Sequence, residues 1–273
     1  MSTRSLIVVS VVALAAAAPV GARLTADHVS LPDAVGDGDP DITKITAGSN
    51  GSGGLTFIVD IGNRSELGDD EYVQVFIDSD HNRATGAQPI GVDFALQMDR
   101  EDVALFHWDG ASFVAVPNSS TYGYIYSGFR FGVRQSDIGA TAGAISYYAK
   151  TLSGEKKDEA PDGQIADVQL STTPLRLTVS QFAATKTVKV GKRYTAAMRA
   201  LRNDLEETTS AGIVTCSAKL GKKTLKVDAV FPEDIAGCIG TAPKAAKGKM
   251  LKLTVSLELD GVRVSRTASV KVR

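Results

Sequence analysis

Apolar and polar residues alternate with a period of two in many short segments of this chain. Leu55, Phe57, Val59 and Ile61 alternate with Thr56, Ile58, Asp60 and Gly62. A period of two places alternate side chains on one face, which predicts half-buried β-strands rather than helices. In the same half we expect further strands at 73–77, 92–98, 103–108, 112–116, 122–126, 128–134, 144–151 and 165–170.

Turn residues separate these segments, and helical patterns are missing from the sequence. Asn50-Gly51 and Asp109-Gly110 are typical of tight turns between strands. No window carries an apolar stripe with a 3.6-residue period over three turns. We expect at most one helical turn, which Ser136 begins and Gly139 ends.

The C-terminal half repeats the strand pattern. We expect strands at 175–180, 193–201, 213–220, 223–230, 250–259 and 262–272. Asp260-Gly261 predicts a two-residue hairpin between the last two. Six or seven strands in about 100 residues are typical of an immunoglobulin-like sandwich. The predicted fold class is therefore all-β, with two tandem β-sandwiches, the second Ig-like with one disulfide.

The two halves carry opposite net charges. Residues 23–173 contain 10 Lys and Arg against 23 Asp and Glu, a net charge of −13. Residues 174–273 contain 19 Lys and Arg against 8 Asp and Glu, a net charge of +11. We therefore expect an acidic domain over 33–170, a linker at 171–174 and a basic domain over 175–273.

This asymmetry has three interpretations. In the first interpretation, the two halves attract each other and dock, and physiological salt screens this attraction over ~8 Å. Alternatively, the basic half binds an anionic partner, such as a wall polymer, a nucleic acid or an anionic glycan, or its lysines and arginines only solvate strand faces. We expect no nucleic acid partner, because the basic half offers only Phe182, Phe231 and Tyr194 as stacking groups.

The N-terminus has the pattern of a secretory signal peptide over 1–22. Arg4 precedes an apolar run from Leu6 to Ala18, and small residues place the cleavage after Ala22. We expect a flexible leader over 23–32 and no membrane span, because the run is shorter than the ~20 residues that a spanning helix needs. The sequence therefore predicts a secreted, extracellular protein, with association at the cell surface as an option.

Cys216 and Cys238 are the only cysteines. Export exposes them to an oxidising environment, so we expect them to form a disulfide. Their spacing is too short for the antibody-type bridge between sheets, and no Trp lies between them. We therefore expect an Ig-like domain rather than a true Ig domain.

Oxygen-bearing side chains alternate after the predicted strand that ends near residue 77. Asp78, Asp80 and Asn82 stand at i, i+2 and i+4, and Asp41 and Asp93 are weaker candidates to complete a shell. Calcium takes six to eight oxygen ligands, whereas magnesium demands stricter octahedral geometry. Turn capping by Asp and Asn is the alternative explanation. The net charge of this half favours a bound cation, so we expect a structural calcium ion.

These residues also carry a resemblance to a known group of domains. The strings Gly36-Asp37…Pro40-Asp41-Ile42-Thr43-Lys44-Ile45, Ile77 to Gly86 and Gly91-Val92-Asp93-Phe94 resemble a β-sandwich domain of secreted bacterial proteins of the actinobacterial type. That domain is distantly similar to DOMON domains and to family-nine carbohydrate-binding modules. The resemblance covers about residues 33 to 170 and implies a non-catalytic binding or adhesion role, with calcium as an option.

Two further points follow from the resemblance. Some DOMON domains bind haem, but Met98 and His107 show no evident pairing as axial ligands, so haem is not expected here. The C-terminal half is similar to the Ig-like modules that end such secreted proteins. Cys216, Cys238 and Lys247-Gly248-Lys249 carry this weaker match.

Aromatic residues suggest where a ligand would bind. Tyr122, Tyr124 and Tyr126 alternate and so share one face of one strand. Trp108 precedes the Asp109-Gly110 turn. Such rings stack on sugars, which makes these four residues a candidate glycan platform. Core packing together with Phe129 and Phe131 is the alternative.

The sequence lacks the signatures of common enzymes. It contains no Gly-x-Ser-x-Gly, no His-Glu-x-x-His, no phosphate-binding glycine loop and no Cys-x-x-Cys. We therefore expect a non-enzymatic binding or adhesion protein whose partner is an extracellular glycan or cell-wall polymer. A structural surface module that uses its basic domain is the first alternative, and an extracellular hydrolase is the second.

Overall fold

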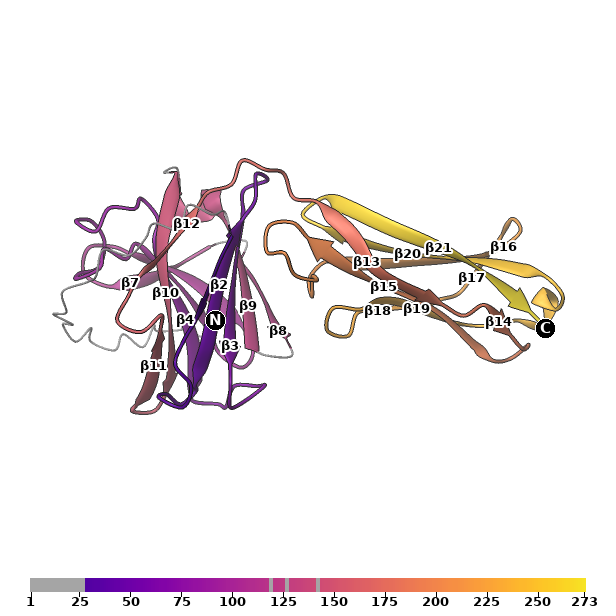
Figure 1. The fold of residues 1–273 in the computed structure, drawn as a ribbon, viewed down its shortest axis with the longest axis horizontal. Helices are drawn as coiled ribbons and strands as arrows, with labels where there is room; N and C mark the ends of the chain where they lie inside the picture. The colour runs from indigo at the N-terminus through magenta and orange to yellow at the C-terminus, as the bar shows by residue number, and fades with distance from the viewer. Residues whose placement is uncertain (1–27, 118–119, 126–127, 141–142) are drawn as a thin grey trace. The chain divides into compact units, whose positions relative to one another are not determined.

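The computed structural model describes residues 28–117, 120–125, 128–140 and 143–273. They form two compact units, which meet in the sequence between Pro174 and Leu175. Each unit consists of two β-sheets, as Figure 1 shows. The fold class is all-β, as the alternation predicts, with one sandwich-like pair of sheets in each half. The expected signal peptide over 1–22 lies outside the described residues.

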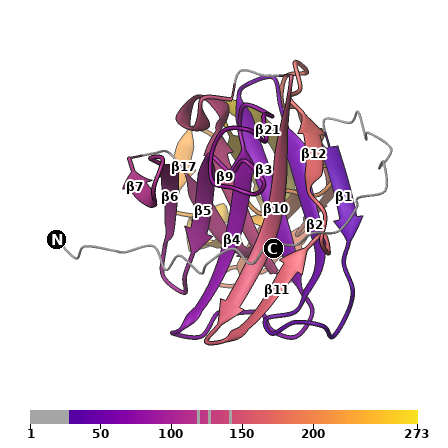
Figure 2. The same cartoon turned by 90° about the vertical axis from the view of Figure 1, so that its left-hand side faces the viewer.

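The N-terminal unit has a five-stranded and a seven-stranded sheet. The first has the order β1-β2-β3-β9-β8; the second has the order β11-β10-β4-β5-β6-β7, with β12 beside β10. In Figure 2 the strands β7, β6, β5, β4 and β10 of the second sheet lie side by side in this order. The strands of the first sheet are β1 (His28–Pro32), β2 (Ile42–Ser49), β3 (Gly54–Ile61), β8 (Thr121–Ile125) and β9 (Gly128–Arg134). Those of the second are β4 (Glu71–Asp78), β5 (Phe94–Met98), β6 (Val103–Trp108), β7 (Phe113–Val116), β10 (Ala144–Ser153), β11 (Lys156–Ala160) and β12 (Ala166–Gln169).

Large apolar side chains from both sheets fill the space between them. Phe57 on β3 contacts Tyr147 on β10, with ring centroids 5.5 Å apart. Phe129 and Phe131 on β9 are fully buried in the same core. The packing alternative for these two phenylalanines is thereby confirmed, and burying them removes some of the largest apolar surfaces of the unit from water.

The C-terminal unit has the strand order of an immunoglobulin-like sandwich. Its four-stranded sheet contains β13 (Leu177–Ala184), β15 (Arg193–Arg202), β19 (Ala236–Thr241) and β18 (Asp228–Val230). Its five-stranded sheet contains β14 (Thr187–Val188), β21 (Val262–Val272), β20 (Met250–Leu259), β16 (Ile213–Leu220) and β17 (Lys223–Leu225). When the strands are lettered in chain order, the first sheet has the order ABED and the second has the order GFCC′. The short strand β14, which follows strand A in the sequence, lies beside strand G.

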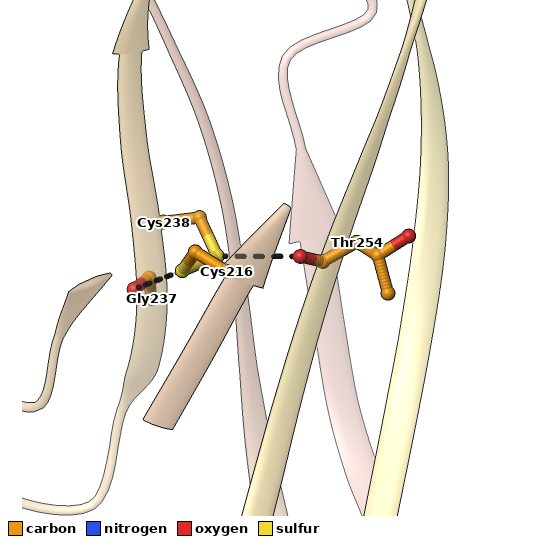
Figure 3. Close-up of a disulfide and its surroundings, with 4 residues drawn as sticks. All are labelled: Cys216, Gly237, Cys238 and Thr254. Atoms are coloured by element: carbon orange, nitrogen blue, oxygen red, sulfur yellow. Dashed lines mark hydrogen bonds between the residues drawn. A yellow bond between two sulfur atoms is a disulfide. The ribbon is translucent and has the colours of Figure 1, made fainter. Parts of the chain in front are cut away.

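The disulfide Cys216–Cys238 is present and joins the two sheets of this unit. Cys216 lies on β16 and Cys238 on β19 (Figure 3), which correspond to strands C and E rather than the antibody pair B and F. The sulfur of Cys216 lies 3.3 Å from the carbonyl oxygen of Gly237, and that of Cys238 lies 3.6 Å from the carbonyl oxygen of Thr254. The bond indicates an oxidising compartment. Among the described residues, no helix is long and apolar enough to span a membrane.

Some expectations about local structure need correction. Residues 28–32 belong to the expected flexible leader, yet they form β1 against β2, and Val29 is buried in the core. Residues 223–230 form two strands rather than one, because the chain passes from one sheet to the other between β17 and β18. The expected helical turn is a 3₁₀ helix, η1 (Gln135–Ile138); Gly139 ends it with φ 59°, but Arg134 rather than Ser136 precedes it. A second, η2 (Lys244–Ala246), precedes β20.

Candidate functional site

Three carboxylates meet at one end of the seven-stranded sheet. Asp78 is the last residue of β4, Asp93 directly precedes β5, and Asp80 lies in the loop between these strands. The backbone fixes Asp93, since its N–H donates to Ile77 and its carbonyl accepts from Trp108. Carboxylate oxygens of the three residues lie within 4.8 Å of one another. We call Asp78, Asp80 and Asp93 the acidic triad.

Short hydrogen bonds hold the loop around the acidic triad. The N–H of Asn82 donates to Asp78 Oδ1 at 3.0 Å and to Asp80 Oδ1 at 2.9 Å. Ser79 donates its N–H and its hydroxyl to Asp93 Oδ2 at 2.9 and 3.0 Å. Each carboxylate therefore has at least one oxygen in a fixed position, as a preformed ligand set requires.

Asp78 is the buried member of the acidic triad. The residue is 3% exposed, and Oδ2 has no hydrogen-bond partner in the described part of the chain. The pKa of Asp78 is raised to about 6, mainly by burial and in part by Asp80 and Asp93, while the Asn82 N–H opposes the shift. An anionic oxygen without a partner in a buried position is costly, so this site favours a cation or a proton.

Of the other predicted metal ligands, Asn82 lies in the loop of the acidic triad and Asp41 lies in another group. The amide oxygen of Asn82 accepts the N–H of Ala84 at 3.2 Å, so it caps its own turn. Asp41 belongs to a different group of carboxylates, with Asp37 and Asp158, and does not complete the acidic triad. The fold therefore keeps Asn82 beside the acidic triad and separates Asp41 from it.

The second carboxylate group has ordinary structural partners. Asp158 accepts the N–H of Ile42 at 2.6 Å and that of Glu159 at 2.8 Å. Asp41 accepts the N–H of Gly36 at 2.7 Å. These bonds satisfy the buried carboxylates through backbone donors, and they link β11 to the start of β2.

The donor set of the acidic triad selects a class of metal. All of its candidate ligand atoms are carboxylate oxygens, without sulfur or imidazole. Such hard oxygen ligands suit Ca²⁺ and Mg²⁺ rather than Zn²⁺ or Cu²⁺. The acidic cluster could therefore hold a divalent cation of this class.

The proposed aromatic platform is divided between two sheets. Trp108 lies on β6 of the seven-stranded sheet, whereas Tyr122 and Tyr124 lie on β8 of the five-stranded sheet. Tyr126 lies outside the described residues. Trp108 contacts Phe113 instead, with ring centroids 5.2 Å apart.

Trp108 is part of an aromatic row that the sequence interpretation missed. Phe113 contacts Phe76 at 6.2 Å, and Phe76 stacks on Tyr148 at 4.7 Å. Phe76 alternates with the core residues Val75 and Ile77, so it lies on the sheet face that turns away from the core. The row consists of Tyr148, Phe76, Phe113 and Trp108. Aromatic residues at the outward positions of the predicted strands were the signal that could have found it.

Comparisons with known proteins give no family. No family model matches the chain, and no curated protein matches it. Among solved structures, a chimeric titin Z1Z2 carrying a decorin peptide is 11% identical, with a TM-score of 0.33, covering 84% of this chain and 96% of that one. Titin domains Z1Z2 in complex with telethonin are 11% identical, with a TM-score of 0.28, covering 82% and 89%. At these scores the matches add nothing to what the strand order shows.

Proposed function

We propose that this chain is an exported, non-enzymatic binding protein whose N-terminal unit is stabilised by a Ca²⁺ ion at Asp78, Asp80 and Asp93. The observation that carries the proposal is Asp78 Oδ2, which is buried beside two other carboxylates without a hydrogen-bond partner among the described residues. A bound cation satisfies this oxygen and removes the repulsion among the three charges.

Export is supported by the disulfide and by the signal-peptide pattern of the sequence. Extracellular fluids provide calcium at concentrations that suit weak extracellular sites, for which dissociation constants of about 10⁻⁴ to 10⁻³ M are usual. We expect the dissociation constant of a site with three carboxylates at the end of a β-sandwich to lie in this range.

Thermal unfolding of the full chain with calcium and then with excess chelator tests the proposal. Calcium at about a hundred times Kd should stabilise the N-terminal unit by ~2.7 kcal/mol, which raises its Tm by several degrees. Asp78→Asn should abolish the calcium response and should raise the Tm in chelator, because it removes a buried repulsive charge. Asp70→Asn, an exposed acid of the same unit outside the triad, is the matched control.

Isothermal titration with CaCl₂ gives an independent readout. Heat of binding in the wild type and in Asp70→Asn, but not in Asp78→Asn, supports the site. If the wild type shows neither heat nor a shift in Tm, the carboxylates serve only as turn caps and the cation is rejected.

The ligand class that we propose is an extracellular glycan, bound on the aromatic row. Trp108, Phe113, Phe76 and Tyr148 line one outward sheet face, and all four remain partly accessible. Partly exposed aromatic rings offer flat apolar surfaces on which a sugar ring can stack. The sugar-binding role no longer rests on Tyr122, Tyr124 and Tyr126.

Retention on insoluble chitin, cellulose and peptidoglycan tests this ligand class. Trp108→Ala should weaken retention on the bound polysaccharide, whereas Phe182→Ala, a partly exposed aromatic of the other unit, should not. Equal loss in both variants, or no retention of the wild type on any polymer, would reject a glycan on this face.

A further inference from the structure

One end of the C-terminal unit brings together four segments that are distant in sequence. Register pairs Thr187 with Lys271, Met250 with Lys271, and Lys219 with Lys252. Figure 1 shows β14 and the C-terminus together at this end of the unit. We call this end the basic pole; it consists of residues 185–193, 219–224, 242–252 and 270–273.

Backbone hydrogen bonds fasten these segments together. The N–H of Val190 donates to Arg273 at 3.1 Å, and that of Gly191 donates to Ala242 at 2.8 Å. The N–H of Gly248 donates to Val272 at 2.9 Å. The side chains of the pole therefore project from a fixed frame, which lowers the entropy cost of holding a ligand.

The basic pole carries only positive side-chain charges. Its four segments contain no Asp, Glu, His or Tyr residue. Its Lys and Arg residues are all exposed: Lys186, Lys189, Lys192, Arg193, Lys219, Lys222, Lys223, Lys244, Lys247, Lys249, Lys252, Lys271 and Arg273. Over residues 175–273, all of which the structure describes, none of these cations lies within 4.0 Å of a carboxylate.

Acidic residues of the unit gather at its other end. They lie in the β15–β16 connection, the β18–β19 connection and the β20–β21 hairpin, apart from Asp228 on β18. The ion pairs Arg199–Asp234, Arg202–Asp204 and Arg263–Glu258 are all outside the basic pole. The net charge of the C-terminal half is therefore concentrated on one end, rather than spread over its strand faces.

Four of these cations surround one open cavity. Lys189, Lys244, Lys247 and Arg273 line it together with Val190, and its volume is about 540 Å³. These cationic side chains repel one another, and only the backbone carboxylate of Arg273 offsets them, so a multiply charged anion in the cavity relieves that repulsion. The cavity is large enough for a phosphate group with part of the chain that carries it.

From this arrangement we infer that the basic pole binds a phosphate-bearing polymer, with one phosphate in the Lys189–Lys244–Lys247–Arg273 cavity and its neighbours on the surrounding lysines. Most of the cations are lysines, which bind phosphate as point charges. The four segments contain no aromatic residue on which bases would stack. This favours a polyphosphate or phosphodiester polymer without bases, and it does not depend on the calcium proposal.

Titration of the full chain with long-chain inorganic polyphosphate, followed by calorimetry at 50 and 200 mM NaCl, tests the inference. The double variant Lys244→Gln/Lys247→Gln removes two phosphate contacts. It should therefore bind polyphosphate about tenfold more weakly and reduce the slope of log K against log salt by about two. The control variant Arg263→Gln/Arg266→Gln removes the same number of charges from β21 outside the basic pole. It should leave the affinity for polyphosphate within about twofold of the wild type.

Equal losses in the two double variants would show binding to net charge alone and would overturn the assigned cavity. No binding of polyphosphate at 50 mM NaCl would also overturn it. A Tm of the C-terminal unit matching the wild type shows that each variant is folded. Calcium binding is measured separately on the N-terminal unit, so failure here and failure of the proposed function are distinguishable.

Three further probes define the polymer. Inorganic phosphate should bind much more weakly than polyphosphate, because it cannot reach the surrounding lysines. Poly-glutamate of equal charge that binds as tightly would contradict selectivity for phosphate. A single-stranded oligonucleotide that binds more tightly than polyphosphate of equal charge would reassign the pole to nucleic acid.

Discussion

Arg202 and Asp204 form a buried bidentate ion pair in the C-terminal unit. Nε of Arg202 donates to Oδ1 of Asp204 at 2.6 Å, and Nη2 donates to Oδ2 at 2.7 Å. The two side chains are 4% and 2% exposed. Because neither charge has access to bulk water, each contributes to the solvation of the other. The pair fixes the end of β15 and the connection that follows it.

Removing one member of this pair should destabilise the unit strongly. Asp204→Ala leaves a buried guanidinium without its counter-charge, so the free energy of unfolding should fall by about 3–5 kcal/mol. Urea unfolding of the full chain measures the loss in the C-terminal transition. Asp228→Ala, an exposed acid of the same unit, should cost less than about 0.5 kcal/mol. Similar losses in both variants would show that the pair is not the cause.

A methyl group at Gly128 should not fit. The Cβ of an alanine there would lie 2.8 Å from the Cα of Asp60 and 3.0 Å from the N of Ile61, both on β3. Backbone atoms of a paired strand cannot rotate away from the added methyl group. Gly128→Ala should therefore lower the free energy of unfolding by about 1–3 kcal/mol. Gly143→Ala, where a Cβ meets no atom within 4 Å, is the control in the same unit. Chemical unfolding that finds equal stabilities would contradict this close approach.

Stability of the N-terminal unit should depend on the protonation of Asp33. The pKa of Asp33 is raised from 3.8 to about 6, mainly by burial and in part by the charges of Asp162, Asp158 and Asp37, while the backbone N–H of Asp162 opposes the shift. The folded state holds this proton more tightly than the unfolded state does. Protonation of Asp33 therefore contributes its full stabilisation to the unit below pH 4, and this stabilisation is lost as the pH rises through about 6. In chelator, the Tm of the unit should therefore fall between about pH 4 and pH 6.5.

Asp33→Asn should reduce that fall, because the amide keeps no titrating charge there. Asp70→Asn changes an exposed acid and should leave the fall as in the wild type. A Tm profile for Asp33→Asn that is parallel to the wild type would assign the pH dependence to the other buried acids.

Loss of the disulfide should affect one unit only. The bond closes a loop with a sequence separation of 22, for which the chain-entropy model gives about 3 kcal/mol. Cys216→Ala/Cys238→Ala should lower the free energy of unfolding of the C-terminal unit by about this amount. Calorimetry should show its transition at a lower temperature and the N-terminal transition unchanged. A shift of both transitions would contradict the independent folding of the units.

Local patterns in the sequence were sufficient for the all-β class, for most of the strands and for the disulfide. Alternation in Leu55–Ile61 predicts a strand because burial of one face requires a period of two, whatever the partner strand is. Cys216 and Cys238 were each other's only partners in the sequence. Strands with weak alternation, such as β2 and β19, were missed, because their burial comes from neighbours in the sheet rather than from their own pattern.

The site depended on tertiary structure. Asp78 and Asp80 are close in sequence, but the register of β4 with β5 alone decides that Asp93 joins them and Asp41 does not. The same holds for the basic pole, where strand pairing brings Lys189, Lys247 and Arg273 around one cavity. Sequence determines which residues must be buried or exposed along a strand; which distant residues meet is decided by strand order and register, because these contacts form only when the sheets assemble.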